Sequence, residues 1–358
     1  WKAWGDIRTP EAVKEEVLRI TRELNDLAQR AEFGLEFRPV AEVTSEEEAV
    51  KASCCDSDLV IVYPANGWGD MLRACTPKDR SLIFVRHRSG PLYYWYESLS
   101  ARYLRTGKDA DDAEKALSVD DVVVDDTDEL LWRLRAFYAV KNFRATRVLA
   151  LGGAYGKYAE NAPQVAQEKL GLTIETCSYD DFAPRVEKAL ADKALMNLAE
   201  TWTDTYLKIP GAKPATERSF IVNSFILYGL FKELMQEHNA SVFTINQCMG
   251  TIMPMAKTTA CLTLSLMNYE GIPAFCESDF VIIPTGILLH HVTCKPVFQH
   301  NSSFPHKGIM TCAHCTSPRR MDGRRYEPTL LTTHYESEYG VAPKVDMPIG
   351  QELTFIDP

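Results

Sequence analysis

The sequence predicts an α/β protein with two parallel-sheet α/β/α domains, followed by the start of a β-rich, barrel-like C-terminal domain. Three observations predict it. Short apolar runs typical of buried strands alternate with amphipathic segments typical of helices. This alternation restarts with an apolar run at residues 147–151, and after residue 323 it gives way to short β-like segments with Pro and Gly. The expected domains are residues 1–143, 144–322 and 323–358.

The first expected domain alternates helices with strands. Its first helix has a clear start signal, because Thr9 and Pro10 precede an apolar rhythm of 3.6 residues. The expected elements are helices over residues 11–30, 45–52 and 129–143 and strands over residues 35–43, 58–63 and 81–85. Ligands usually bind beyond the carboxyl ends of parallel strands. The loops at 64–69 and 86–91 are therefore candidate ligand-binding segments.

The second expected domain repeats this pattern. Its expected strands cover residues 147–151, 172–177, 242–246, 295–299 and 307–312, and its helices cover 163–169, 179–197 and 217–238, with a further helix ending at 291. Gly152, Gly153 and Gly156 follow the first of these strands. They are consistent with a phosphate cradle or with a tight strand-to-helix turn that requires glycine, and the turn is favoured.

Composition excludes several classes of protein. The net charge is 39 − 49 = −10, whereas nucleic-acid binding that ignores sequence needs a basic surface. No apolar run reaches the roughly 18 residues of a membrane-spanning helix. The ten cysteines are scattered, which favours buried free thiols and a cytoplasmic location. The chain starts at Trp1 and ends after a strand-like segment, so we expect further residues at both ends.

Glu277 and Asp279 are the strongest local signal of a functional site. They lie between an apolar stretch and a helix that is almost uncharged, where carboxylates are costly unless they are paired, hydrogen-bonded or metal-bound. Residues two apart in an extended chain point to the same side, so both can face one cavity. Helix capping is the alternative, and it explains Asp279 well but Glu277 poorly.

Two other clusters leave their alternatives open. Residues 86–88 form a basic group suited to an anionic or polyhydroxyl ligand, and the aromatic residues 93–96 that follow are suited to pack on a sugar. The alternative is an aromatic core patch with surface arginines. Cys312 and Cys315 form a C-x-x-C pair around His314. Structural zinc would need a second closely spaced pair, which the sequence lacks, so packing thiols are favoured over a redox role. By itself, His314 is more typical of a satisfied core histidine than of a ligand.

The motifs at residues 147–156, 246–247, 276–279 and 311–314 occur in an order that resembles the L-fucose isomerase / L-arabinose isomerase superfamily. More narrowly, the chain resembles an uncharacterised, sugar-isomerase-like branch. The resemblance implies two α/β domains and a C-terminal β-barrel, a bound divalent ion such as Mn²⁺, aldose–ketose interconversion and a homo-oligomer with a small sugar as its substrate.

The resemblance also implies roles for particular residues. Glu277 corresponds to the metal-binding catalytic glutamate, with Asp279 as a second catalytic group. The implied metal ligands are Glu277, Asn301, His300 and His314, and the implied substrate-binding residues are Arg86, Trp68, Gln247 and His334. Asn301 departs from the family, because an amide binds metal more weakly than a carboxylate and does not shuttle a proton. For His334, a surface strand histidine is an equal alternative.

We therefore expect a divalent-metal-dependent carbohydrate isomerase that acts through an ene-diol. This chemistry needs a hard cation on two neighbouring sugar oxygens and a base that moves a proton between C1 and C2. The alternatives are a metal-assisted sugar epimerase or lyase, and a non-catalytic carbohydrate-binding protein of the same fold. Nucleic acid and membrane are not expected as partners.

Overall fold

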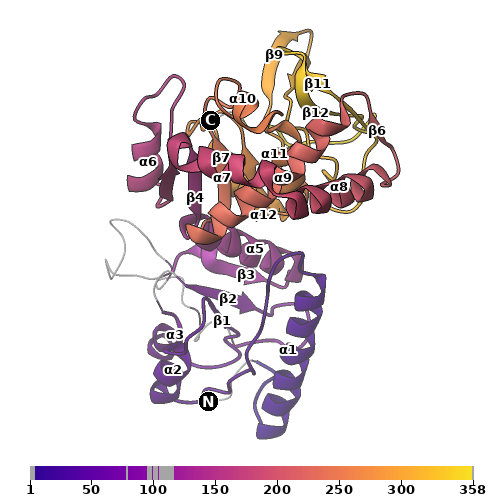
Figure 1. Ribbon diagram of the computed structural model, residues 1–358. Helices are drawn as coiled ribbons and strands as arrows, with labels where there is room; N and C mark the ends of the chain where they lie inside the picture. Colours follow the sequence, from indigo (N-terminus) through magenta and orange to yellow (C-terminus); the bar gives the residue numbers. More distant parts are fainter. Residues whose placement is uncertain (1–4, 78–79, 95–98, 100–103, 105–116, 357–358) are drawn as a thin grey trace. The chain divides into compact units, whose positions relative to one another are not determined.

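Parallel sheets flanked by helices occur in both halves of the chain, which confirms the predicted α/β class. The structure is a computed structural model that describes residues 5–77, 80–94, 99, 104 and 117–356 (Figure 1). The chain divides into two units, Trp1–Ala136 and Phe137–Pro358, and each is described here by itself. The predicted boundary at residue 143 falls inside helix α5 (Thr127–Arg144), which runs across the division.

The first unit contains a three-stranded parallel sheet in the order β1-β2-β3. The strands are β1 (Val60–Val62), β2 (Ser81–Val85) and β3 (Val122–Val124), and the helices described with them are α1 (Pro10–Arg30), α2 (Glu46–Ser53), α3 (Gly69–Cys75) and the 3₁₀ helix Val119–Asp121. Alternate residues of β2 face opposite sides of the sheet. Leu82 and Phe84 pack with α1 and α5, while Ile83 packs with Leu72 of α3.

Local signals fix α1 but do not produce the strand expected at 35–43. Thr9 caps α1 by accepting a hydrogen bond from Ala12 N, and Pro10 occupies the first turn, as predicted. Residues 35–43 form no strand, so that prediction was wrong. Pro39 has no N–H to donate to a neighbouring strand, which explains why this segment joins no ladder.

The second unit is built on a four-stranded parallel sheet in the order β5-β4-β7-β8. Its strands are β4 (Arg147–Leu151), β5 (Thr173–Cys177), β7 (Val242–Ile245) and β8 (Ala274–Phe275). Leu149 and Leu151 face a large core together with Phe243. Val148 and Ala150 face a second, smaller core on the other side of the sheet.

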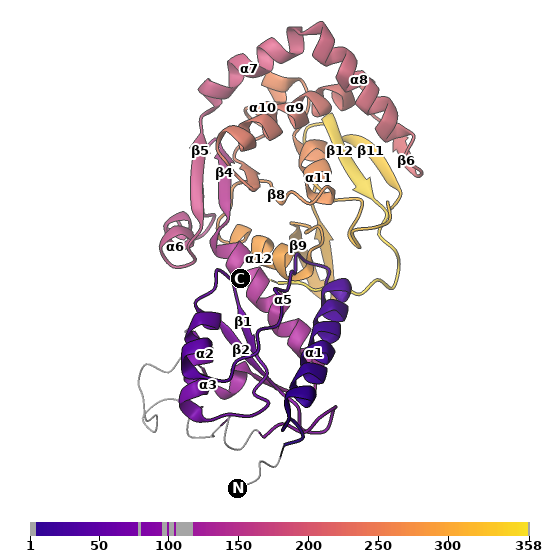
Figure 2. The same cartoon turned by 90° about the horizontal axis from the view of Figure 1, so that it is seen from below.

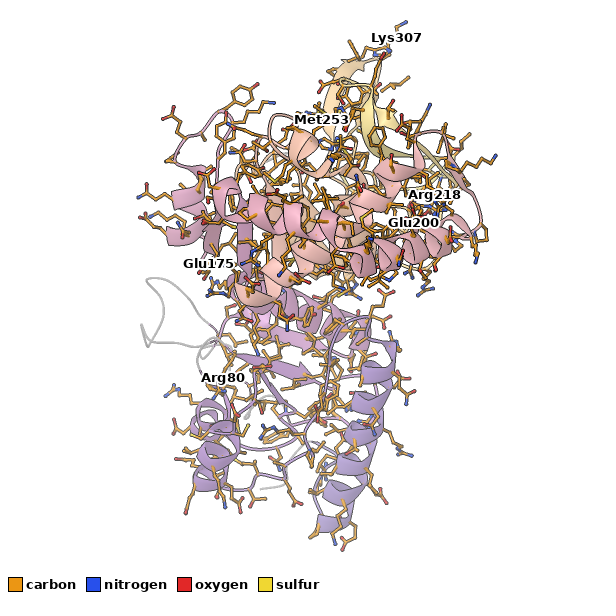
Figure 3. The ribbon with its side chains drawn as sticks, in the orientation of Figure 1. Arg80, Glu175, Glu200, Arg218, Met253 and Lys307 are labelled. Carbon is orange, nitrogen blue, oxygen red and sulfur yellow. The ribbon has the colours of Figure 1, made fainter. Side chains whose placement is uncertain are left out.

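Helices cover both faces of this sheet (Figure 2). They are α6 (Ala162–Glu168), α7 (Tyr179–Ala191), α8 (Lys193–Leu207), α9 (Arg218–Glu237), α10 (Ile252–Ala256), α11 (Cys261–Tyr269) and α12 (Ile283–Thr293). On the outer surface, Arg218 of α9 binds Glu200 and Asp204 of α8 (Figure 3). Among the described residues, no helix combines the length and the apolar character that crossing a membrane requires.

The β-rich C-terminal segment belongs to the second unit, which corrects the expectation that a third domain begins at residue 323. Two antiparallel pairs form it: β9 (Asn301–His306) with β10 (Ile309–Ala313), and β11 (Thr329–His334) with β12 (Tyr339–Val345). β11 also pairs in parallel with β6 (Ala212–Pro214), and Leu331 lies in the main core of the unit. Lys307 lies at the tip of the β9–β10 hairpin (Figure 3).

His291, near the end of α12, makes the stability of the second unit depend on pH. Burial, together with His290, lowers the pKa of His291 to about 4 from an ordinary value of 6.5. Its Nε2 lies 3.3 Å from Thr146 Oγ1. The unfolded chain takes up this proton near pH 6.5, whereas the folded unit resists it down to about pH 4. The stabilising contribution is therefore fully present above pH 6.5 and is lost as the pH falls towards 4.

We expect the thermal midpoint of the second unit to fall over this pH range, and to fall less steeply in His291→Gln. Glutamine keeps a polar group near Thr146 but does not titrate. Scanning calorimetry of both proteins at several pH values measures the difference. Equal slopes would contradict the assignment of this pH dependence to His291.

Candidate functional site at the strand ends

Three neighbouring strands of the second unit end in left-handed turns. Gly152 (φ +81°) follows β4, Gln247 (φ 51°) follows β7, and Glu277 (φ 66°) and Ser278 (φ 49°) follow β8. Such φ values are uncommon for residues other than glycine, and they gather at functional sites. The carboxyl ends of parallel strands share one edge of the sheet, where ligands usually bind. This edge is therefore the candidate site.

The turn after β4 needs a glycine, as the tight-turn interpretation predicts. A Cβ at Gly152 would overlap the ring of Tyr179. The Tyr179 hydroxyl donates a hydrogen bond to the carbonyl oxygen of Asn246, in the turn after β7. The close approach at Gly152 thus links the turns that follow two neighbouring strands.

Asp279 holds the turn after β8 in place. Its Oδ1 accepts hydrogen bonds from Lys157 N and Val281 N, both at 3.1 Å, and the residue is buried. Glu277, in contrast, is exposed. The left-handed residues between the strand and Asp279 break the extended chain, so the two carboxylates do not face one cavity as expected. Asp279 therefore stabilises the loop, and its catalytic role stays a prediction.

Four cysteines from separate segments converge behind this turn. Cys276 Sγ lies 3.9 Å from Cys248 Sγ, the sulfurs of Cys261 and Cys315 lie within 4.8 Å of each other, and Cys276 and Cys315 are close enough to shift each other's pKa. We call Cys248, Cys261, Cys276 and Cys315 the thiol cluster. Two of its members follow strands β7 and β8, one begins α11 and one follows β10. The cluster therefore joins the sheet edge to the C-terminal strands.

The thiols of the cluster do not titrate alike. Hydrogen bonds from Cys248 and Cys315 hold the pKa of the Cys276 thiol well below its usual range. The hydrogen bond with Cys276 raises the pKa of Cys248, and the one with Cys261 raises the pKa of Cys315. A thiolate at Cys276 is stabilised by its neighbours, and its charge opposes the loss of a second proton nearby.

Two predicted histidines lie beside the thiol cluster. A nitrogen of His334 and the sulfurs of Cys261 and Cys315 all lie within 4.8 Å of one another. His334 is buried, burial lowers its pKa, and its ring stacks on Tyr335 with a centroid distance of 5.0 Å. His314 Nδ1 lies 3.0 Å from Thr316 Oγ1 and 3.7 Å from Cys315 Sγ. The alternative that His334 is a surface histidine is therefore excluded.

The remaining predicted site residues of the second unit do not belong to the thiol cluster or to the group of Cys261, Cys315 and His334. Gln247 is exposed and directly precedes Cys248. Asn301 is exposed on β9, where it pairs with Ala313. His300 packs its ring against Phe298 and Phe355, with centroid distances of 5.9 and 5.4 Å. Its sequence neighbour Gln299 accepts a hydrogen bond from Cys276 N at 2.8 Å and donates one to Cys276 O at 3.2 Å.

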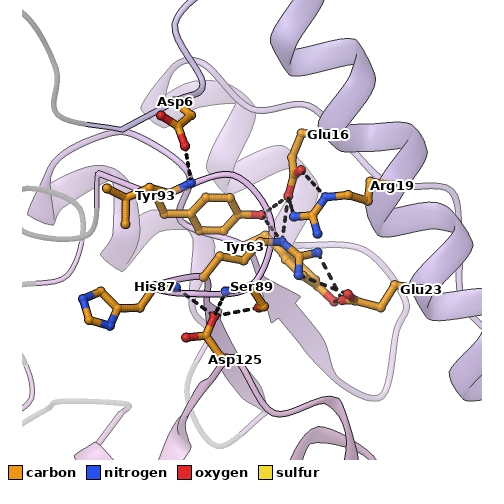
Figure 4. A network of polar contacts seen from close by, with 11 residues as sticks. Asp6, Glu16, Arg19, Glu23, Tyr63, His87, Ser89, Tyr93 and Asp125 are labelled. Atoms are coloured by element: carbon orange, nitrogen blue, oxygen red, sulfur yellow. Dashed lines mark hydrogen bonds and ion pairs between the residues drawn. The ribbon is translucent and has the colours of Figure 1, made fainter.

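Arg86 has a structural role in the first unit, which corrects its prediction as a sugar-binding residue. The guanidinium is buried, donates to Glu16 Oε1 at 2.9 Å and binds Glu23 Oε2 at 3.1 Å. The loop that follows is held by Asp125, which accepts hydrogen bonds from the N–H groups of residues 87–89. Figure 4 shows His87 and Ser89 beside Asp125. Trp68, at the start of α3, donates from Nε1 to Glu46 Oε1 at 3.0 Å.

The donors that converge do not fit the expected Mn²⁺ centre. Mn²⁺ prefers carboxylate, carbonyl and water oxygens. Among the described residues, the group of Cys, His, Asp and Glu ligands close enough to share an ion is Cys261, Cys315 and His334, and Glu277 does not belong to it. Two thiols and an imidazole are softer ligands, of the kind that zinc binds. A hard cation therefore finds no prepared set of oxygen ligands in this group.

The sequence does not predict that the four cysteines of the thiol cluster lie together. Cys312 and Cys315 form the one C-x-x-C pair in the sequence, and a zinc motif would need a second pair. A weaker signal is present, because Cys248 and Cys276 each lie within three residues of the end of a parallel strand. Strand ends of one sheet meet at one edge, so cysteines placed there are expected to be neighbours.

A scan against protein-family models gave no match to this chain. A search of curated proteins gave no match either.

Proposed function

We propose that the protein is a carbohydrate isomerase, or a close relative, that interconverts an aldose and a ketose through an ene-diol. One observation carries the proposal: predicted site residues that are remote in the sequence gather at the thiol cluster. Gln247, Glu277 and His314 are each the chain neighbour of one of its cysteines, and a ring nitrogen of His334 lies within 4.8 Å of the sulfurs of two of them. Glu277 and His334 are separated by more than fifty residues, and each lies next to the thiol cluster, Glu277 through its chain neighbour Cys276 and His334 through Cys261 and Cys315.

Glu277 is suited to the role of proton-transfer base. Its carboxylate is exposed at the strand-end turn, where a substrate can reach it. It also acts electrostatically on Cys248 and Tyr335, so its charge is felt within the site. Moving a proton from C2 to C1 of a sugar requires one base that takes the proton up and returns it. A carboxylate on an accessible turn meets that requirement.

His314 is suited to bind a sugar oxygen. His314 Nδ1 lies 3.0 Å from the Thr316 hydroxyl, and in the tautomer in which Nδ1 accepts this hydrogen bond, Nε2 carries the ring proton and donates it. A donor in this position stabilises the negative charge that develops on oxygen as the ene-diol forms. The exposed amide of Gln247 adds a second polar contact for the substrate. Within this proposal the substrate is a small sugar, and the net charge of −10 argues against nucleic acid.

The decisive variant is Glu277→Gln, with Glu187→Gln as the matched control. Both replace an exposed carboxylate by an amide of the same size, but Glu187 lies on α7, away from the strand-end turns. We expect the wild type and the control to exchange the C2 hydrogen of a sugar with deuterated water. Glu277→Gln should lose about a hundredfold or more of the exchange rate. Nuclear magnetic resonance across a panel of aldoses and ketoses measures the exchange.

The products separate the proposal from its alternatives. An aldose converted to a ketose supports the isomerase, whereas a product with a broken C–O bond indicates a lyase. Wild-type protein that binds sugar without exchange in any member of the panel would indicate a binding protein and contradict the proposal. Equal exchange in Glu277→Gln and wild type would remove Glu277 as the base.

A further inference from the structure

We propose that Cys261, Cys315 and His334 form a binding site for a zinc-like divalent metal ion. The three residues come from the start of α11, the segment after β10 and the end of β11. One ligand atom from each lies within 4.8 Å of the other two. Neither the sequence pattern nor the expected Mn²⁺ centre includes this combination.

The spacing of the three atoms suits tetrahedral zinc. Zinc binds sulfur at about 2.3 Å and imidazole nitrogen at about 2.0–2.1 Å, which puts neighbouring ligand atoms about 3.6–3.8 Å apart. The observed limit of 4.8 Å means that shifts of about 1 Å bring all three into bonding range. Two thiolates and one imidazole leave the fourth tetrahedral position to water or another oxygen ligand, as in catalytic zinc sites.

His334 supplies an independent reason to expect a ligand. The residue is 4% exposed, and its Nδ1 is buried without a hydrogen-bond partner among the described residues. Leaving such an atom unsatisfied costs about 1–3 kcal/mol, and buried polar atoms of native proteins are rarely left so. A metal ion bound at the imidazole fixes its tautomer and orientation and gives the buried ring a strong partner.

The surrounding hydrogen bonds hold the three ligands on rigid elements. Ser265 of α11 donates to the Ser317 carbonyl at 2.7 Å, which ties the helix of Cys261 to the segment of Cys315. Thr259, just before α11, donates to Val341 O at 2.9 Å and accepts from Val341 N at 3.1 Å. Val341 lies on β12, the strand paired with the β11 strand that carries His334. Ligands held in this way bind metal with little loss of freedom.

Metal binding displaces protons from the site. The two thiols lose their protons to solvent, the neutral imidazole donates its lone pair, and no electron is transferred. The Cys276 thiol is close enough to Cys315 for each to shift the other's pKa, and it lies just outside the three-atom group. A Cys261–Cys315 disulfide would need an oxidant and would remove both sulfur ligands, so it is a competing outcome of the test.

The test measures metal in the full chain, purified under reducing conditions and without any sugar. We expect about one zinc per chain by mass spectrometry of the elements. After removal with a chelator, titration with Co²⁺ should give the intense visible bands of a tetrahedral site and a thiolate charge-transfer band. Because no substrate is used, failure here is distinguishable from failure of the proposed isomerase.

Three variants locate the site. Cys315→Ser and His334→Gln should each weaken Co²⁺ binding by about tenfold or more, since each removes one ligand. Cys312→Ser is the matched control, because Cys312 shares the C-x-x-C pair with Cys315 and does not belong to the ligand group. Circular dichroism verifies that each variant is folded. If one of these two variants does not fold, the other variant and the cobalt spectrum of the wild type still test whether the metal binds at this site.

The opposite results are equally clear. Wild-type protein that binds neither zinc nor Co²⁺ would overturn the proposal. So would a Cys312→Ser variant that loses the metal as completely as Cys315→Ser, because the C-x-x-C pair would then be the site. A Cys261–Cys315 disulfide found in the reduced preparation by peptide mass spectrometry would also overturn it.

Discussion

Replacing Arg86 with methionine is expected to destabilise the first unit by about 3–5 kcal/mol. The guanidinium is buried and binds two carboxylates, one of which, Glu16, is itself buried. Methionine fills most of the volume but removes the buried positive charge that Glu16 and Glu23 share, and Glu16 keeps only Arg19 as a cationic partner. Breaking a buried ion-pair network in this way is strongly unfavourable. Urea unfolding, with hydrogen–deuterium exchange of peptides from the first unit, measures the loss.

Arg88→Met is the matched control for this variant. Arg88 lies two residues away in the same loop, and its side chain is exposed, so its replacement should change stability by about 0.5 kcal/mol or less. Adding Glu16→Gln to Arg86→Met should recover part of the lost stability, because one of the two carboxylates that lose Arg86 is then neutral. If Arg86→Met and Arg88→Met have equal effects, the buried network does not stabilise the unit.

Replacing Phe231 with alanine is expected to destabilise the second unit by a similar amount, about 3–5 kcal/mol. Phe231 on α9 is fully buried, stacks on Phe243 of β7 with a centroid distance of 4.3 Å and lies 5.8 Å from Phe182 of α7. The variant loses the buried ring and leaves a cavity between helix and sheet. Hydrogen–deuterium exchange should show the faster exchange in peptides of α9 and β7.

Phe304→Ala serves as the control for Phe231→Ala. Phe304 is 79% exposed on the β9–β10 hairpin, so its loss removes little packing. Phe231→Leu should cost less than alanine, because leucine fills part of the cavity. Equal stabilities of Phe231→Ala and Phe304→Ala would show that the stacked rings contribute little to the core.

Elements with strong local signals could be predicted from the sequence. The cap at Thr9 marks the start of α1, and the apolar runs at β2 and β4 are five-residue strands that lie within a residue of the predictions. The expected helix at 179–197 is instead two helices, because Asp192 ends α7 and caps α8 by accepting from Ala194 N and Leu195 N. An internal cap inside a periodic segment is easily missed.

The site could be predicted only in part, because its arrangement depends on contacts between remote residues. Glu277 is predicted from a local pattern, and a ligand role for His314 is predicted from the resemblance alone. Glu277 is exposed and Asp279 is buried because the backbone between them is left-handed. The alternating pattern of an extended strand does not predict such backbone angles. Arg86 looked like a ligand-binding group because its partner Glu16 is seventy residues away. The thiol cluster was missed for the same reason, since its cysteines share no spacing along the chain.

Gln299 has a consequence for how the four-stranded sheet ends. Its side-chain amide bonds to both the N–H and the carbonyl of Cys276, directly after the edge strand β8. These are the two backbone groups that an added strand would use for pairing. The side-chain amide of Gln299 therefore makes the two hydrogen bonds that one residue of a fifth strand would make. It closes this position against pairing with another protein chain, which is the risk that every exposed sheet edge carries.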